Sequence, residues 1–339
     1  MKRLLSRFSL MSVLIILCFI NNLAQEQAEF DYTKDPELLK AINDAMDSPV
    51  SELFILWNQF DWIQLTFPQP SNLLNPLKPN TRRAEWASVY SLIPTFPIPL
   101  GKVNWVSRIA LQFPTLPLKE ELGKLFNVTP GGGAIIGDTS LVNTIRDPYG
   151  KTSGFGDMLY IGLFGPKGGF KTEDASIIWA VGPTIMMPTA SKDILGTGKW
   201  SAGPALVLMY SGSNWKYGFF LQQWWSFAGD DNRADVNMTN TQYFIYYSPH
   251  PDWAFGMSPN FTVNWNAAPE NQMTFPIGFG FNKTFYFGEL PVAIGAEWYY
   301  SIASPEYAPG SRHSFRLYVM PVFPAPWSDL AKLIREKMP

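Results

Sequence analysis

A small set of charged and bulky polar side chains interrupts segments that are otherwise apolar, and these residues are the ones most able to do chemistry. They are Arg108, Gln112, Lys216, Gln222, Trp224, Glu297 and Arg316, with Asp157 at the end of another such segment. Fixed charges that line one passage can select the solutes that enter it. The same charges can also neutralise one another, with Arg108 and Arg316 paired to Glu297 and Asp157. A selectivity or binding constellation and an ion-paired filling are both open interpretations.

Acid–base catalysis has few candidate residues in this chain. The only histidines are His250 and His313. His250 lies in Ser248-Pro-His-Pro-Asp252, which is typical of a solvated turn. His313 and Ser314 are neighbours on a predicted strand and therefore point to opposite faces, so they cannot act together as base and nucleophile. We expect no enzymatic activity.

Cofactor and metal sites are equally poorly supported. The segment Gly196-Thr-Gly-Lys-Trp200 is similar to part of a phosphate-binding loop, but Trp200 stands where that loop has Ser or Thr. A strand rather than a helix is predicted to follow, so we interpret the segment as a surface loop and turn. The sequence contains no cluster with metal-ligand spacing, and the net charge of −2 carries no nucleic-acid signature. We expect no cofactor, no metal and no nucleic-acid partner.

The elements that must position these side chains are strands with one large apolar face and one small polar face. Residues 253–265 show the pattern best, because large side chains from Trp253 to Trp265 alternate with small ones such as Gly256 and Ser258. Successive side chains of a strand point to opposite faces. At about 3.3 Å per residue and a tilt of roughly 40°, this segment covers about 30 Å, the height of a bilayer core. A Trp at each end matches the aromatic girdles of membrane barrels.

Twelve segments fit this kind of strand. They are 53–66, 85–96, 103–114, 154–165, 175–188, 199–211, 215–227, 240–249, 253–265, 272–284, 290–301 and 312–323. Short and long connections alternate between them, as periplasmic turns and extracellular loops do. We therefore predict an all-β fold, a transmembrane antiparallel up-and-down β-barrel of about 12 strands with short periplasmic and loop helices. Ten strands is the alternative, because 53–66 has the weakest pattern.

The barrel prediction also places the polar side chains. A charge that faces lipid at mid-bilayer costs about 2–4 kcal/mol, so the seven interrupting residues are expected to line the lumen. Asp157 is expected at the rim, because its face of the strand continues as Leu159 and Ile161.

The first residues have the features of a secretory signal peptide. Lys2, Arg3 and Arg7 precede an apolar stretch over 10–20, and Ala24 offers a cleavage site before a polar segment. The only cysteine, Cys18, lies within this peptide, so the processed chain would have no thiol. The composition is 15% aromatic and 16% charged, the latter well below the roughly 25% of ordinary soluble domains. A secreted soluble β-protein is the less favoured alternative.

The expected organisation has four parts. A signal peptide covers 1–24, an N-terminal periplasmic helical segment 25–52, the transmembrane barrel 53–323 and a C-terminal periplasmic helical extension 324–339. Short helices are predicted at 35–46, within 118–126 and from Trp327 onward.

Several motifs from residue 154 onward resemble a known family. They are Gly154-Phe-Gly-Asp157, Trp179-Ala-Val-Gly-Pro183, Met187-Pro-Thr-Ala190, Leu195-Gly-Thr-Gly-Lys-Trp200, Gly203-Pro204 and Gln223-Trp-Trp-Ser-Phe-Ala-Gly229. As a group they resemble outer-membrane barrels classed with meta-pathway phenol-degradation proteins. The resemblance implies passage of small aromatic or hydrophobic compounds. Such barrels usually end on an aromatic residue read by the barrel assembly machinery, whereas here further residues follow Phe323.

These patterns lead to one functional expectation and one alternative. We expect a bacterial outer-membrane channel or transporter for small, hydrophobic or aromatic molecules. The alternative is a non-conducting barrel with a structural or surface-binding role. The expected partners are outer-membrane lipids, a small solute that the sequence does not identify, and the barrel assembly machinery.

Overall fold

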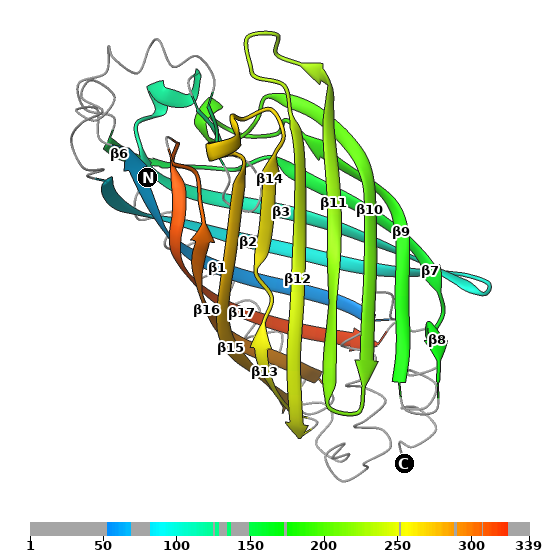
Figure 1. Ribbon diagram of the computed structural model, residues 1–339. Helices are drawn as coiled ribbons and strands as arrows, with labels where there is room; N and C mark the ends of the chain where they lie inside the picture. Colours follow the sequence, from blue (N-terminus) through cyan, green and yellow to red (C-terminus); the bar gives the residue numbers. More distant parts are fainter. Residues whose placement is uncertain are drawn as a thin grey trace.

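The chain forms a closed barrel of twelve antiparallel strands (Figure 1). The computed structural model describes residues 53–68, 82–124, 126–128, 134–136, 149–172, 175–250, 252–287, 290–306 and 308–324. Ten barrel strands are continuous: β1 (Leu53–Pro68), β2 (Arg82–Leu100), β3 (Val103–Leu118), β9 (Ala175–Met187), β10 (Lys199–Gly212), β11 (Trp215–Gly229), β12 (Asn237–His250), β15 (Met273–Phe287), β16 (Leu290–Ala303) and β17 (Gly310–Pro324). Two are broken: β6 (Tyr149–Ser153) with β7 (Met158–Pro166), and β13 (Trp253–Met257) with β14 (Asn260–Asn264).

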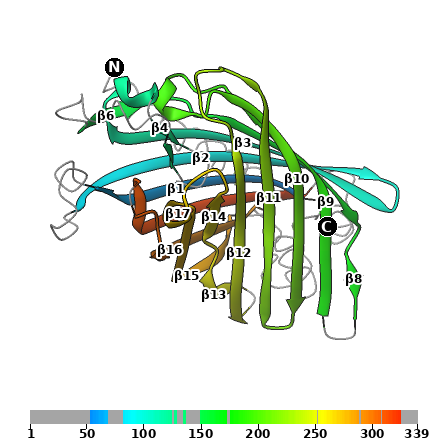
Figure 2. The same cartoon turned by 45° about the horizontal axis from the view of Figure 1, so that its top comes forward.

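Pairing of the first strand with the last closes the barrel. Leu53 of β1 lies opposite Pro324 of β17, and the register continues along both strands. In the two views, β9 to β12 run steeply while β1 to β3 cross behind them at a large angle, which is the strand tilt that closure requires (Figures 1 and 2). Because β1 is a full barrel strand, the count is twelve and the alternative of ten is wrong.

The connections at the two ends differ in length as predicted. The turns 101–102 and 213–214 lie at one end, which we call the turn side, and the chain positions 53 and 324 lie there too. The connections 188–198 and 230–236 lie at the opposite end, the loop side. Short periplasmic turns and longer outer loops are typical of membrane barrels.

Short elements lie outside the twelve strands. They are β8 (Phe170–Lys171) beside β9, the small hairpin of β4 (Phe126–Val128) and β5 (Ala134–Ile136), and the 3-10 helices η2 (Glu120–Lys124), η4 (Asp193–Leu195) and η5 (Pro269–Asn271). No helix in the described ranges is long and apolar enough to cross a membrane.

The predicted helices agree with the structure less well than the predicted strands do. The helix expected within 118–126 is only the 3-10 helix η2, because β3 continues as far as Leu118. The signal peptide at 1–24, the segment 25–52 with its helix at 35–46, and the helix from Trp327 within 324–339 all lie outside the described residues, apart from the strand end at Pro324.

The large apolar side chains face outward, as the alternation predicts. Phe279 is 60% exposed, Trp265 52% and Trp86 49%. Similar side chains, among them Phe255, Trp298 and Phe315, surround the barrel. This much exposed apolar surface around a closed barrel forms the lipid-facing belt of a membrane protein.

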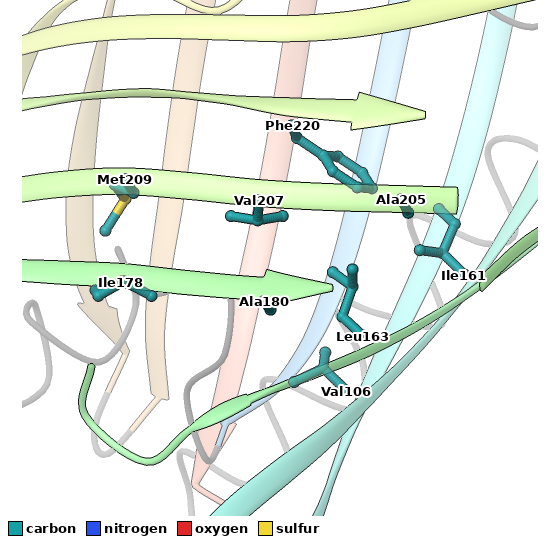
Figure 3. Packing of buried hydrophobic residues seen from close by; sticks show 9 residues of the cluster. All are labelled: Val106, Ile161, Leu163, Ile178, Ala180, Ala205, Val207, Met209 and Phe220. Atoms are coloured by element: carbon teal, nitrogen blue, oxygen red, sulfur yellow. The ribbon is translucent and has the colours of Figure 1, made fainter. Parts of the chain in front are cut away.

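Apolar side chains fill the part of the barrel interior next to β9, β10 and β11, in the turn-side half of the barrel. The cluster consists of Val106, Ile161, Leu163, Ile178, Ala180, Ala205, Val207, Met209 and Phe220 (Figure 3). Figure 3 shows Phe220 extending from β11 toward Ala205 of β10. The cluster therefore fills part of the barrel interior with apolar side chains.

Glycines on the small inner face give space to large side chains of the neighbouring strand. Gly278 and Gly280 of β15 lie opposite Tyr299 and Glu297 of β16. A Cβ at Gly280 would lie 2.4 Å from Glu297 Cγ, and one at Gly278 would lie 2.7 Å from Tyr299 Cδ1. The absence of a side chain at these two positions therefore lets Tyr299 and Glu297 lie flat across β15.

Replacing Gly280 with valine is expected to destabilise the barrel by about 1–3 kcal/mol, as overpacking does in close-packed interiors. The Val side chain would displace Glu297 from its position against the strand. Urea unfolding in detergent micelles measures the effect. The matched control is Phe279→Val, one residue away on the lipid-facing side, which should shift the midpoint much less. A wild-type midpoint for the Gly280→Val variant would show that Glu297 is not held by this contact.

Candidate functional site

Two cavities lie inside the barrel, one above the other. The loop-side cavity has a volume of about 180 Å³ and the turn-side cavity about 200 Å³. Arg108, Phe220 and Gln242 line both of them. These three residues, here called the junction, come from β3, β11 and β12. They therefore mark the place where the two cavities meet.

The loop-side cavity is apolar toward its outer end. Leu65, Phe67, Leu116 and Leu118 line it, together with Leu195 of η4. The same residues pack in one buried cluster with Leu122 and Ile194. An ion pair of 2.6 Å between Lys192 and Glu120 joins the loop before η4 to η2. The two 3-10 helices thus cover part of the loop end of the barrel with apolar side chains.

Arg316 of β17 is the centre of a buried polar network. In register it lies between Glu297 of β16 and Asp61 of β1. Its Nε donates to Asp61 Oδ1 at 2.9 Å, and its Nη1 lies 3.7 Å from Glu297 Oε2. The same Nη1 donates to the Ser258 carbonyl at 2.8 Å, and Nη2 donates to Asn260 Oδ1 at 3.3 Å. Every nitrogen of Arg316 therefore has an acceptor.

Glu297 is satisfied by hydroxyl groups as well. Tyr246 and Tyr299 donate to its carboxylate, and Ser258 Oγ lies 3.1 and 3.2 Å from its two oxygens. These partners come from different strands, so the network ties β12, the β13–β14 strand and β16 together through the interior. A buried carboxylate with this many donors is a structural element rather than a free charge.

The break in the ninth barrel strand allows Ser258 to join this network. Pro259 has no N–H to donate to a sheet, and β13 ends at Met257 while β14 begins at Asn260. The Ser258 carbonyl is thereby free to accept from Arg316. The Pro259 carbonyl accepts instead from the backbone N–H of Tyr243 at 3.2 Å.

Arg108 differs sharply from Arg316. Its neighbours in register are Thr95 of β2 and Ile161 of β7, neither of which carries a charge. In the described part of the chain, its Nε is buried without a hydrogen-bond partner. The centroid of the Phe220 ring lies 5.6 Å from its guanidinium carbon. The pairing of Arg108 with Glu297 or Asp157 is therefore wrong, whereas Arg316 does pair with Glu297.

The other sequence candidates occupy three kinds of place. Gln112 lines the loop-side cavity and Lys216 the turn-side cavity. Gln222 also lines the loop-side cavity and accepts from Thr184 Oγ1 at 3.2 Å. Trp224 is fully buried, and its Nε1 donates to the same Thr184 hydroxyl at 3.1 Å. Trp224 thus fills the interior without lining either cavity.

Asp157 holds the connection between β9 and β10 at the loop side. Its carboxylate accepts from the Thr197 backbone N–H at 2.6 Å, the Thr197 hydroxyl at 2.8 Å and the Ala190 N–H at 3.2 Å. Arg233 donates to the Gly196 carbonyl at 2.6 Å in the same loop. Burial raises the pKa of Asp157 above its ordinary value, although these donors and the charge of Arg233 oppose the shift. The phosphate-loop-like segment at Gly196 belongs to this anchored loop.

Four residues of the site were not among the candidates. Asp61 could have been predicted in the same way as Arg316. Both are charged residues within apolar membrane strands, and a charge that faces lipid is costly, so both side chains should point inward. Ser258 was assigned to the small face but given no role. Phe220 and Gln242 carried no signal, since a phenylalanine on the inner face looks like any other apolar residue in sequence.

Neither histidine lines the loop-side or the turn-side cavity. His313 is on the outer face, with its ring centroid 5.2 Å from that of Tyr300, and His250 is exposed at the end of β12. Within the described ranges there is no group of three or more His, Cys, Asp or Glu side chains that could hold a metal.

Comparison with known proteins identifies the fold and nothing finer. No family model and no curated protein matches the sequence. An outer membrane channel from Pseudomonas putida F1 has a similar structure, with a TM-score of 0.52, 15% identity, and coverage of 80% of this chain and 94% of that one. The likeness is one of fold.

Two further barrels score lower. The TodX monoaromatic hydrocarbon channel gives a TM-score of 0.39 at 8% identity, over 80% of this chain and 90% of that one. Outer membrane phospholipase A from Escherichia coli gives 0.38 at 12% identity, over 81% and 90%. One is a channel and the other an enzyme, so neither likeness carries a functional argument.

Proposed function

We propose that this chain is an outer-membrane channel that passes small, largely apolar molecules through the interior of its barrel. The observation that carries the proposal is the pair of cavities that meet at Arg108, Phe220 and Gln242. One cavity extends toward the loop side and the other toward the turn side. Together they provide the route that a solute would follow from one membrane face to the other.

The lining of the two cavities supports small, mainly apolar solutes. Leucine and phenylalanine side chains line the loop-side entrance, and Trp57, Phe244 and Tyr318 line the turn-side cavity. Apolar walls with a few polar groups are typical of sites for small organic molecules. The likeness in fold to an outer membrane channel from Pseudomonas putida F1 supports a channel. The motif resemblance to barrels classed with phenol-degradation proteins supports small aromatic or hydrophobic solutes.

Single-channel recording tests the proposal. The chain purified from residue 25, after the predicted signal peptide, is expected to give discrete current steps in planar bilayers. Phe220→Ala should raise the step size, because it removes a ring from the junction. Phe219→Ala is the matched control, since Phe219 is the next residue of β11 and lies on the opposite face, and it should leave the step unchanged.

Absence of current would contradict the proposal. A barrel that shifts on heating in gel electrophoresis, and is therefore folded, but gives no steps for the wild type or for Phe220→Ala would favour the non-conducting, surface-binding alternative.

A further inference from the structure

The two interior arginines, Arg316 and Arg108, differ in their hydrogen-bond and ion-pair partners. Arg316 has two carboxylates, a carbonyl and a side-chain amide as partners. Arg108 has a buried Nε without a hydrogen-bond partner among the described residues. Leaving a buried charge unpaired is costly. Because Arg108 carries this cost and lines both cavities, it is a candidate for contact with a ligand.

The charge around Arg108 identifies the ligand's polar group. The two charged residues that line the turn-side cavity in the described part of the chain, Arg108 and Lys216, are both basic. On the loop side, the carboxylates of Asp61 and Asp157 are held by Arg316 and by Thr197 and Ala190. An anion entering the junction therefore meets a guanidinium with no competing carboxylate. The planar fork of arginine suits a carboxylate, which it can bind through two hydrogen bonds.

The walls of the turn-side cavity identify the rest of the ligand. Trp57, Phe220, Phe244, Tyr246 and Tyr318 are among its lining residues. The Trp57 indole Nε1 is also buried without a hydrogen-bond partner in the described ranges, which leaves a second donor at this cavity. Aromatic walls favour stacked or edge-on contact with a planar ring. The cavity volume of about 200 Å³ exceeds the roughly 150 Å³ of a cavity known to hold benzene.

We propose that the turn-side cavity is a binding site for an aromatic monocarboxylate, whose carboxylate contacts Arg108 and whose ring lies among the aromatic walls. This inference rests on the proposed channel function and names its substrate class. Occupation by the ligand would supply the acceptor that Arg108 lacks. Arg108 would then act as a specificity-determining residue at the junction.

Calorimetric titration of the detergent-purified chain tests this site without requiring a membrane. Benzoate is the probe, benzyl alcohol the neutral analogue of similar shape, and inorganic phosphate the anion without a ring. Benzoate should bind, and both of the others should bind at least about tenfold more weakly, because each lacks one of the two recognised features. Arg108→Gln should weaken benzoate binding by about tenfold or more, and Arg108→Lys, which keeps the charge without the fork, by less. Arg312→Gln is the matched control, since Arg312 is exposed and lies over Tyr300 rather than at a cavity.

Three results would overturn the inference: equal affinity for benzoate and benzyl alcohol, equal affinity for phosphate, or unchanged binding to the Arg108→Gln variant. Arg108→Gln removes no hydrogen-bond or ion-pair partner of another described residue, so the variant should fold, and heat-shift electrophoresis checks this. Benzoate binding without conductance would contradict the channel function but support the binding site. Conductance without benzoate binding would support the channel function but contradict the binding site.

Discussion

Replacing Arg316 with methionine is expected to destabilise the barrel by about 3–5 kcal/mol, the usual result of removing one partner from a buried ion pair. Asp61 and Glu297 would face each other across β17 without the cation that separates them, and the Ser258 carbonyl would lose its donor. Methionine keeps much of the side-chain volume, so the loss reports on charge and hydrogen bonding rather than on a cavity.

The matched variant is Arg108→Met, the same chemical change at the unpaired arginine. It should leave the free energy of unfolding unchanged or raise it, because no other described residue loses a hydrogen-bond or ion-pair partner. Urea unfolding of both variants, followed by tryptophan fluorescence, measures the difference. Equal destabilisation by the two substitutions would show that Arg108 is also part of a structural network.

The second large effect is expected for ion selectivity. Arg108 lies at the junction and, unlike Arg316, forms no ion pair with a described residue. Its positive charge is therefore not neutralised, and the wild-type channel should prefer anions. Arg108→Glu replaces that charge by its opposite at the same place. The preference should then reverse to cations, because charges that line a constriction determine which ions enter it.

The reversal potential in a salt gradient across a planar bilayer measures this change, and its sign should invert in the variant. Arg312→Glu makes the same change in net charge outside the cavities and should leave the sign as in the wild type. A cation preference already present in the wild type, or one sign shared by the wild type and Arg108→Glu, would show that other charges control the passage.

Alternation was sufficient to predict the barrel. A strand with one bulky apolar and one small face, such as Met273–Phe287, can be recognised without knowing its partners, because the lipid on one side and the interior on the other impose the pattern. The strand ends were less exact: β2 runs from Arg82 to Leu100, beyond the predicted 85–96, because a barrel strand can extend past the bilayer where no alternation is imposed. The prediction of a helix within 118–126 was wrong because β3 also extends further than predicted, and Leu118 still pairs with Tyr149 of β6.

Only part of the site could be predicted from the sequence. The cost of charge in lipid indicates which residues point inward, but it does not say which of them meet. Arg316 meets Asp61 because β17 and β1 close the barrel, a contact between residues far apart in the chain. Asp157 meets Thr197 only because the β9–β10 loop folds back over it. Arg108 has no such neighbour, and an absent partner leaves no pattern in a sequence.

The central claim is that solutes pass the junction between the two cavities. The chain from residue 25 contains no cysteine, since Cys18 is the only one, so a single thiol can be introduced at Phe220. Addition of a negatively charged methanethiosulfonate reagent to the Phe220→Cys channel should reduce its single-channel current, whereas the same reagent on Phe219→Cys should not. Complete labelling of Phe220→Cys, shown by mass spectrometry, with no change in current would contradict a route through this junction.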